Sequence, residues 1–489
     1  MPINNNNRIY YSLFYGKDEV STLNENKKRY GINWANIAST LRWNHIFNDK
    51  LFSNISIYGS KYNYNFSYYQ KGNDNWNSSI DNLSFKIDFT SFISPKHTLK
   101  WGFNQNLHSI NPGNLESDSI EGTPIVAQRQ SRESVIYVNS NYKITNKLSY
   151  NAGFRIPLWA NTGETTIYKF NEENINNDTL KIGYAETYVR FLNFDPRISL
   201  MYRLDSSSSI KASFGIHHQY LNLITNSTSH FTSLEVWLPA DINIKPQRAD
   251  IYAISYMKFF TKKNIELNTD IFYKKMYNQI DYVSHANLFM NPLLEGELRF
   301  GSAYSYGIEF ILRKSIGKLS GWISYSYSRV FKKINGVNNN KEYPAYYDQP
   351  HSFSFYGNYQ ISKRLNFSAN WIYHTGGAIS SPIGFYKYNG NTVPIYGDKN
   401  NDRLPDYHRL DISIRYRFNK KITKFNHSIT LGIYNIYNRK NILTYSYNKA
   451  ELNNGKFVIP RDINDENLYV TTQTSILGFI PSISYRFKF

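Results

Sequence analysis

Apolar and polar side chains alternate with a period of two over much of this chain. The C-terminal run PSISYRFKF places Ser and basic side chains on one parity and apolar ones on the other, namely Ile483, Tyr485, Phe487 and Phe489. Successive side chains of a β-strand point to opposite faces, so this run predicts a strand with one apolar and one polar face. Chain ends usually fray in solvent. A terminus with such a regular pattern is therefore expected to pair with a neighbouring strand of a sheet.

The same alternation recurs from about Arg8 to the C-terminus. KLSYNAGFRIPLW (147–159) and RLDISIRYRF (409–418) each carry apolar side chains on one parity and polar or basic ones on the other. We count about 18 such segments, most of them roughly 9 to 15 residues long, which is long enough to cross a bilayer when the strand is tilted. No helical period of useful length competes with them, so the sequence predicts an all-β fold.

Short and long connections alternate between these segments. The short ones lie near Asn48, Thr145, Ser207, Lys262, Ile316 and Ser362. The long ones are rich in Asn, Gly, Ser and Asp and cover 109–129, 160–187, 220–247, 376–405 and 438–477. Consecutive antiparallel strands put alternate connections at opposite ends of a sheet. The sequence therefore predicts a transmembrane antiparallel up-and-down β-barrel with tight turns at one end and large loops at the other, which is typical of outer-membrane barrels.

Composition agrees with this architecture and excludes others. The mean hydropathy is −0.53 and no run of 18 apolar residues occurs, which excludes a helical membrane protein. The absence of cysteine removes disulfide scaffolds and thiolate metal sites. The net charge of +19 suits an anionic lipid surface, and because the basic residues are spread along the chain no nucleic-acid partner is expected. A soluble pair of sandwiches would also alternate, but so many consecutive strands exceed what open sheets usually carry.

Runs in the second half of the chain resemble the barrel of a TonB-dependent outer-membrane receptor of the type found in Bacteroidota. They are SFGIHHQYLNL (213–223), EVWLPADINIKPQRADIYAISY (235–256), NIELNTDIFYKKMYNQIDY (264–282), 295–328, YYDQPHSFSFYGNYQIS (346–362), WIYHTGGAISSP (371–382) and RLPDYHRLDISIRYRF (403–418). The resemblance extends more loosely forward to Arg8. The terminal aromatics Tyr485, Phe487 and Phe489 resemble the C-terminal signal that the barrel-assembly machinery reads.

The resemblance implies an outer-membrane location and import of a scarce solute, such as a metal chelate, peptide or oligosaccharide. Members have a signal peptide, a small β-sandwich, a plug and a 22-stranded barrel, whereas we expect only the C-terminal part of that barrel here, over residues 8–489. The start, MPINNNNRIYYSLFYGK, does not read as a signal peptide. Contact with the TonB complex is then expected only through the missing plug. A plugless porin-like channel and a non-functional receptor fragment stay open as alternatives, as does a surface lipoprotein partner.

Three residues are candidates for contact with the solute. Trp237 and Tyr346 lie in aromatic loop segments that could stack on a ligand, although aromatics near strand ends are commonly interface anchors. His217 and His218 are adjacent, so only one of them is expected to face the lumen. One imidazole without partners is not a metal site, so loop anchoring competes with ligand contact.

Two further runs have a possible chemistry that the sequence does not favour. Asp398, Asn400 and Asp402 alternate like the first half of a calcium loop, but the glycine and the final Glu of such a loop are absent, so no metal is expected. His408 lies near acidic residues, yet no serine nucleophile accompanies it. We therefore expect a protein that is not an enzyme and that uses no cofactor.

Overall fold

The computed structural model describes residues 2–23, 29–69, 73–117, 125–171, 174–224, 236–284, 286, 291–388, 391–419, 425–449, 469–475 and 477–488. Within these ranges the regular elements are β-strands and three short 3-10 turns: η1 (Thr261–Lys263), η2 (Leu294–Glu297) and η3 (Asn338–Asn340). No helix of the described part is long and apolar enough to span a membrane. The predicted all-β fold is confirmed.

One antiparallel sheet of 22 strands dominates the described structure. Four of them are short: β1 (Pro2–Asn4), β7 (Ile125–Val126), β12 (Thr187–Leu192) and β21 (Tyr343–Pro344). The others are β2 (Asn7–Leu23), β3 (Arg29–Asn48), β4 (Leu51–Tyr69), β5 (Asn73–Ser94), β6 (His97–Ser117), β8 (Arg129–Lys143), β9 (Leu148–Thr162), β13 (Asp195–Arg203), β14 (Ser208–Gln219), β17 (Gln247–Phe260), β18 (Ile265–Tyr282), β19 (Leu298–Lys314), β20 (Leu319–Ile334), β22 (His351–Gln360), β23 (Leu365–His374), β28 (Tyr407–Arg417), β29 (Asn426–Tyr434) and β32 (Ile480–Lys488).

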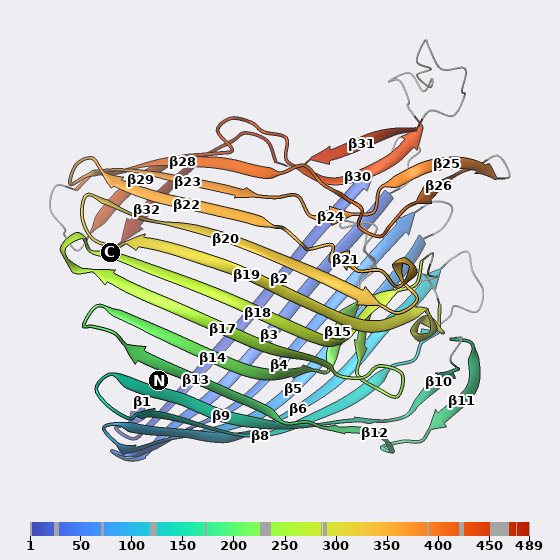
Figure 1. Ribbon diagram of the computed structural model, residues 1–489, viewed down its shortest axis with the longest axis horizontal. Coiled ribbons are helices and arrows are strands. Elements are labelled where there is room, and N and C mark those ends of the chain that lie inside the picture. Colours follow the sequence, from blue (N-terminus) through green and yellow to red (C-terminus); the bar gives the residue numbers. More distant parts are fainter. Residues whose placement is uncertain are drawn as a thin grey trace, which may run out of the picture.

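Each long strand pairs antiparallel with the next long strand along the chain, which confirms the up-and-down order. The sheet curls, so that β2 to β6 form one wall and β17 to β29 the opposite wall (Figure 1). Strands β2 and β32 are the outermost long strands, and no pairing between them is recorded among the described residues.

The short connections are tight turns at one end of the sheet, as predicted. In the turn between β13 and β14, Asp205 accepts hydrogen bonds from the hydroxyls of Ser208 and Ser207 and from the Ser207 amide. These bonds lower the pKa of the Asp205 carboxyl. After η1, Asn264 takes a left-handed conformation (φ 51°), which Asn tolerates better than most residues. Turns closed by their own side chains fix the register of the strands that they join.

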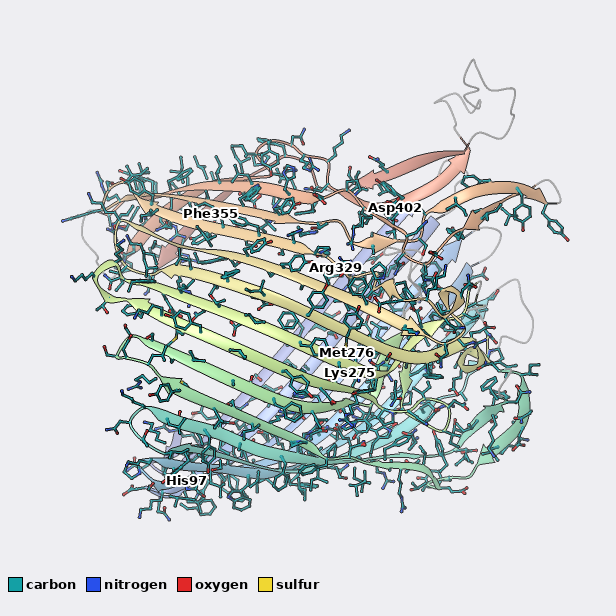
Figure 2. The ribbon with its side chains drawn as sticks, viewed as in Figure 1. His97, Lys275, Met276, Arg329, Phe355 and Asp402 are labelled. Carbon is teal, nitrogen blue, oxygen red and sulfur yellow. The ribbon has the colours of Figure 1, made fainter. Side chains whose placement is uncertain are left out.

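The long connections lie at the other end and contain small hairpins of their own. They are β10 (Thr165–Phe170) with β11 (Asn176–Ile182), β15 (Leu221–Ile224) with β16 (Val236–Pro239), β24 (Ala378–Ile379) with β27 (Asp402–Arg403), β25 (Pro382–Tyr388) with β26 (Asn391–Tyr396), and β30 (Ile442–Lys449) with β31 (Tyr469–Ser475). His97 at the turn end and Asp402 at the loop end mark the two ends of the molecule (Figure 2). The loop predicted at 109–129 is shorter than expected, because β6 continues to Ser117.

The outward face of the sheet is an apolar belt. One cross-strand row joins five aliphatic side chains on neighbouring strands: Leu200, Ala212, Ile254, Ile271 and Ile308. Three of them are 46%, 58% and 54% exposed, in the order Leu200, Ile254, Ile271. A contiguous exposed apolar surface of this extent is unfavourable in water and fits contact with hydrocarbon. The two faces differ sharply: Lys275 is exposed, whereas its neighbour Met276 is buried on the inner face (Figure 2).

The apolar parity read from the sequence lies on this belt. Ile414 of β28 faces Leu431 of β29, which faces Ile483 of β32. Near the turn end, aromatic rings gather on the same face. Phe89 stacks on Trp101 with centroids 4.2 Å apart, and Phe487 stacks on Phe425 at 6.0 Å.

Tyr485 hydrogen-bonds His427 of the neighbouring strand. Phe489 lies outside the described residues. The role of these C-terminal aromatics in assembly stays a prediction.

Candidate functional site

The β15–β16 hairpin folds into the space between the two walls at the long-loop end (Figure 1). Three side chains of one hairpin face, Ile224, Val236 and Leu238, are buried. They belong to one apolar cluster with residues of both walls, namely Tyr64, Trp76, Leu115, Ile280, Tyr282 and Leu298. Each buried aliphatic side chain contributes about 1.5–3 kcal/mol relative to exposure. Among the described residues this cluster therefore joins the hairpin to both walls.

The predicted contact residue Trp237 lies on the other face of this hairpin, opposite Leu223. Its ring meets Tyr62 of β4 edge-on, with centroids 6.3 Å apart. The indole Nε1 has no hydrogen-bond partner among the described residues. Trp237 therefore faces the interior and keeps one free donor, although its role in solute contact stays a prediction.

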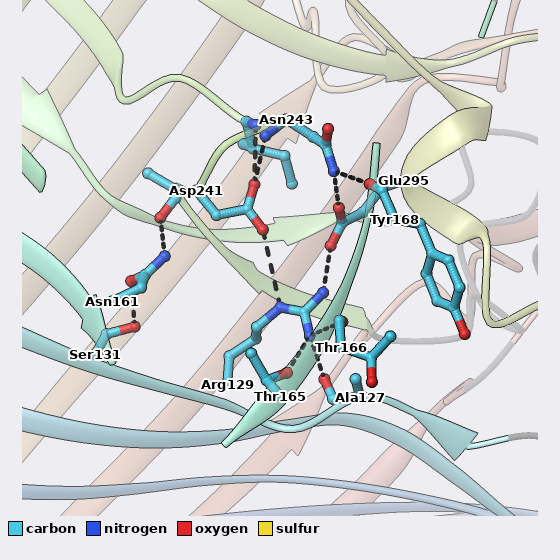
Figure 3. A network of polar contacts seen from close by, with 12 residues as sticks. Ala127, Arg129, Ser131, Asn161, Thr165, Thr166, Tyr168, Asp241, Asn243 and Glu295 are labelled. Atoms are coloured by element: carbon cyan, nitrogen blue, oxygen red, sulfur yellow. Dashed lines mark hydrogen bonds and ion pairs between the residues drawn. The ribbon is translucent and has the colours of Figure 1, made fainter. Parts of the chain in front are cut away.

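A buried polar network holds the chain that follows the hairpin (Figure 3). Arg129, at the start of β8, donates from Nη2 to Oε1 of Glu295 in η2 at 2.9 Å. Its Nη1 donates to Thr165 Oγ1 at 2.8 Å and to the Ala127 and Thr166 carbonyls. One guanidinium thus joins the wall, the β10–β11 hairpin and η2.

Asp241 completes this network from the segment after β16. Its Oδ1 accepts the backbone amides of Asn243 and Ile244 at 2.9 and 3.0 Å, and its Oδ2 lies 3.8 Å from Arg129 Nε. Burial raises the pKa of Asp241 to about 8, with a further upward contribution from Glu295, while Arg129 opposes the shift. When Asp241 is protonated it is neutral, and the remaining charges are the Arg129 cation and the Glu295 carboxylate. These two compensate each other, so no buried charge is left without a counter-charge.

The same segment is fixed a second time through the Ala240 carbonyl. Asn161 Nδ2 and Trp159 Nε1 of β9 both donate to this oxygen, at 2.7 and 3.1 Å. The Trp159 ring stacks on Tyr220 with centroids 5.1 Å apart and planes nearly parallel. Two independent sets of contacts therefore lock the inward segment to the β8–β9 wall.

A chain of charged side chains continues along the inner wall. Arg155 of β9 contacts Glu133 of β8 and lies 3.8 Å from Asp195 of β13. His218 Nδ1 lies 2.6 Å from the other Asp195 oxygen. The predicted contact residue His217 lies 3.1 Å from the Arg197 guanidinium. Both histidines therefore have partners on β13, an arrangement that fits anchoring.

A cavity of about 170 Å³ lies beside the hairpin, on the inner side of the wall. Four amide side chains line it: Gln219, Asn222, Gln247 and Gln279. Tyr346 and Tyr347 line it as well, so the predicted Tyr346 is at this site, and the two rings meet edge-on at 5.0 Å. Asn222 Nδ2 has no hydrogen-bond partner among the described residues.

A second charged cluster borders this cavity. Asp281 accepts hydrogen bonds from Lys399 Nζ at 2.6 Å and from the Tyr343 hydroxyl at 2.8 Å. Lys332 Nζ lies 3.8 Å from Asp281 and donates to the Ile280 carbonyl. Asp281 and Lys332 both line the cavity. Two lysines thus share one carboxylate beside the Asn222 amide; burial lowers the pKa of Lys332, Lys399 adds to this shift, and Asp281 opposes it.

The run proposed as a partial calcium loop borders a different cavity, of about 600 Å³. Asn400 Nδ2 donates to the Pro344 carbonyl, and Asp402 accepts from the Ser381 hydroxyl. Asp398 also lines this cavity. The described ranges hold no group of three or more His, Cys, Asp or Glu placed to bind a metal ion.

The arrangement at the long-loop end can bind a solute through amides, tyrosines and a cationic cluster. The sequence indicated Tyr346 but missed Asn222, the three glutamines and Lys332. Their signal was available: each lies on the inner parity of a strand or hairpin near a long connection, where polar side chains face a shared space. Alternation predicts which face of the sheet a side chain occupies. It does not predict which of the inward side chains come together at one site.

Comparison with known proteins identifies relatives of this architecture. The family model described as "TonB dependent receptor-like, beta-barrel" matches residues 2–436. No curated protein sequence matches the chain at a significant level.

Several solved structures are similar over nearly the whole chain. The ferric-catecholate import receptor Fiu from E. coli K12 has a TM-score of 0.62 at 13% identity, over 98% of this chain and 72% of that one. The ferric preacinetobactin receptor BauA from Acinetobacter baumannii has 0.62 at 12%, over 99% and 70%. The ferric citrate transporter FecA has 0.65 at 11%, over 99% and 68%. At these identities the likeness bears on the fold alone.

Proposed function

The chain belongs to the TonB-dependent receptor-like β-barrel family, and on this premise we propose that it binds an oxygen-rich, anionic metal chelate at its long-loop end for import. Receptors of this family are transporters of the outer membrane and not enzymes, and they act with TonB. The predicted outer-membrane location and the expectation that the chain is not an enzyme are thereby confirmed. The solute is the new element of the proposal.

The observation that carries the proposal is the cationic, amide-lined cavity beside the inward hairpin. Lys332 and Lys399 flank the single carboxylate of Asp281, and Asn222 offers an amide donor without a partner in the described structure. Ammonium and amide donors suit carboxylate or phenolate oxygens, and hydrogen bonds to charged groups are stronger than neutral ones. Fiu, BauA and FecA are named for iron chelates, which makes an iron(III) chelate the first class to test.

In this proposal residues 8–489 supply the wall and the binding surface, and a plug remodelled by TonB supplies the gate. The receptor is of the Bacteroidota type that the sequence runs resemble. The C-terminal strand, with Tyr485 and Phe487 on the outward face, is the segment read by the barrel-assembly machinery. The porin-like alternative receives less support, because the buried hairpin cluster spans the interior.

Calorimetric titration of ferric citrate into the full chain in detergent micelles tests the solute class. We expect saturable binding that weakens at least tenfold when Asn222→Ala is combined with Lys332→Gln. Lys275→Gln is the matched control, because this lysine is exposed on the outward face. Equal affinity of all three proteins would place the chelate elsewhere. Binding of a neutral oligosaccharide or a peptide, but not of ferric citrate, would change the solute class and leave the import function standing.

A further inference from the structure

A groove of about 770 Å³ lies on the outward face of the sheet, away from the cavity just described. Cross-strand pairing defines its floor as one row, in which Gly59, Leu83, Leu107 and Arg132 are successive neighbours on β4, β5, β6 and β8. The row continues through Ala160 of β9 to Arg190 of β12. Directly opposed residues share a face, so all of these side chains point the same way.

That face is the outer one. Leu83 and Leu107 are 55% and 43% exposed and continue the apolar belt. The adjacent parity points inward, because Asn106 of β6 hydrogen-bonds Tyr58 and Glu133 on the inner wall. The groove is therefore open to whatever surrounds the barrel and closed to the lumen.

The height of the groove follows from strand geometry. Leu83 lies 11 residues from Ser94, where β5 ends at the turn side. At about 3.3 Å per residue and a tilt of 35–45°, this is roughly 25–30 Å above the turns. The apolar band of an outer-membrane barrel is about 25 Å tall. The groove consequently lies where the hydrocarbon of the outer leaflet gives way to its headgroups.

The side chains of the groove divide in the same way. Towards the belt it is lined by Leu83 and Leu107. Towards the long-loop end the next row supplies the Lys61–Asp81 ion pair (3.3 Å), Ser109 and Gln130. The groove thus has an apolar row with a polar rim beside it, and Arg132 stands at the end of the apolar row, which suits an acyl chain next to a phosphorylated headgroup.

Two arginines stand at one end of this groove without partners. Arg132 and Arg190 are exposed and form no hydrogen bond or ion pair with any residue in the described ranges. Both are neighbours of Ala160, whose methyl group leaves the space between them open. Strands are about 4.8 Å apart, so the two Cα atoms are roughly 10 Å apart, a distance that two guanidinium side chains can close around one anion.

We propose that this groove binds a phosphorylated lipid of the outer leaflet, with an acyl chain against Leu83 and Leu107 and a phosphate between Arg132 and Arg190. Bidentate guanidinium groups suit phosphate, and the surplus positive charge of the chain complements an anionic surface. A lipid fits better than a free anion, because only a lipid uses both halves of the groove.

Native mass spectrometry of the full chain, equilibrated with detergent micelles containing diphosphoryl lipid A, tests this site. We expect one retained lipid per wild-type chain and at least a tenfold lower occupancy for Arg132→Gln combined with Arg190→Gln. Dephosphorylated lipid A should bind the wild type as weakly as the phosphorylated lipid binds that variant. Lys275→Gln, which removes an exposed outward cation elsewhere, should retain the wild-type occupancy.

A second variant tests the apolar half without touching the arginines. A Cβ at Gly59 would lie 3.7 Å from its nearest neighbour, an ordinary van der Waals distance, so Gly59→Leu places an apolar side chain on the groove floor. It should lower lipid occupancy while a heat-modifiability gel shift shows a folded barrel. Wild-type occupancy in both variants would overturn the proposal. Displacement of the lipid by inorganic phosphate at a similar concentration would also overturn it, because the site would then bind a free anion.

Discussion

Two buried charged clusters lie at the long-loop end, and they are built with opposite surpluses. Around Arg129, one cation faces two carboxyls, and the surplus is removed by a proton on Asp241. Around Asp281, one carboxylate faces two lysines and borders an amide-lined cavity. The first cluster is complete in itself and holds the inward hairpin in place. The second groups two lysine amines around one carboxylate beside free space, an arrangement that suits an anion.

The largest effect is expected from removing a charge from the cluster around Arg129. Arg129→Leu leaves Glu295 buried without its cation, and removal of one partner of a buried pair typically costs about 3–5 kcal/mol. Thermal unfolding of the variant should report a loss of this size, and hydrogen exchange should rise first in segment 236–246. Unchanged exchange in that segment would contradict the role of the network as its lock.

A change of pH tests the same cluster without a mutation. The folded pKa of Asp241 is raised, so the folded state binds a proton that the unfolded state releases between about pH 4 and 8. Stability of the locked segment is therefore greatest at low pH within this window and falls as pH rises towards 8, by up to about 1.4 kcal/mol per unit.

Protection from hydrogen exchange in segment 236–246, measured from pH 6 to 9 and corrected for the intrinsic rate, should fall as the pH rises. Asp241→Asn keeps the side chain neutral and should flatten the profile. A variant with the same slope as the wild type would assign the dependence to another group.

The cluster around Asp281 is tested by removing one of its two lysines. Lys399→Gln leaves Lys332 to pair with Asp281 and removes the second lysine amine. The dissociation constant for ferric citrate should rise about tenfold, equivalent to about 1.4 kcal/mol. Its salt dependence should weaken in parallel. A variant that binds the chelate as the wild type does would show that the second lysine serves stability and not recognition.

The smallest effect is expected outside both clusters. Lys275 is exposed on the outward face, and its ammonium lies 5.1 Å from the centroid of the Tyr277 ring. Lys275→Gln should change the free energy of unfolding by about 0.5 kcal/mol or less and leave ferric citrate binding intact. Denaturant titration of the variant measures the first, and calorimetry the second. A larger loss would mean that outward cations also support the inner site.

The sequence predicted what depends on local alternation. The parity of Ile414, Ile483 and Tyr485, the tight turns and the long connections all follow from a period of two and from turn residues. It did not predict the inward hairpin, because β15 and β16 are too short to show alternation.

The partners of Arg129 were equally hidden from the sequence. Arg129 contacts Glu295, which lies 166 positions later in the chain. The sequence placed Arg129 at the edge of a long loop and gave no sign of such a contact. Convergence of this kind is decided by how the loops fold into the interior, and the strand pattern contains no information about that.

Hydrogen exchange of the full chain with and without ferric citrate is the most direct test of the central claim. The account predicts protection in peptides that cover 219–224 and 279–281, which line the amide cavity. It predicts the same exchange in the presence and absence of the chelate in the β25–β26 hairpin. Protection only in the β25–β26 hairpin, or in no part of the inner wall, would contradict a solute site beside the inward hairpin.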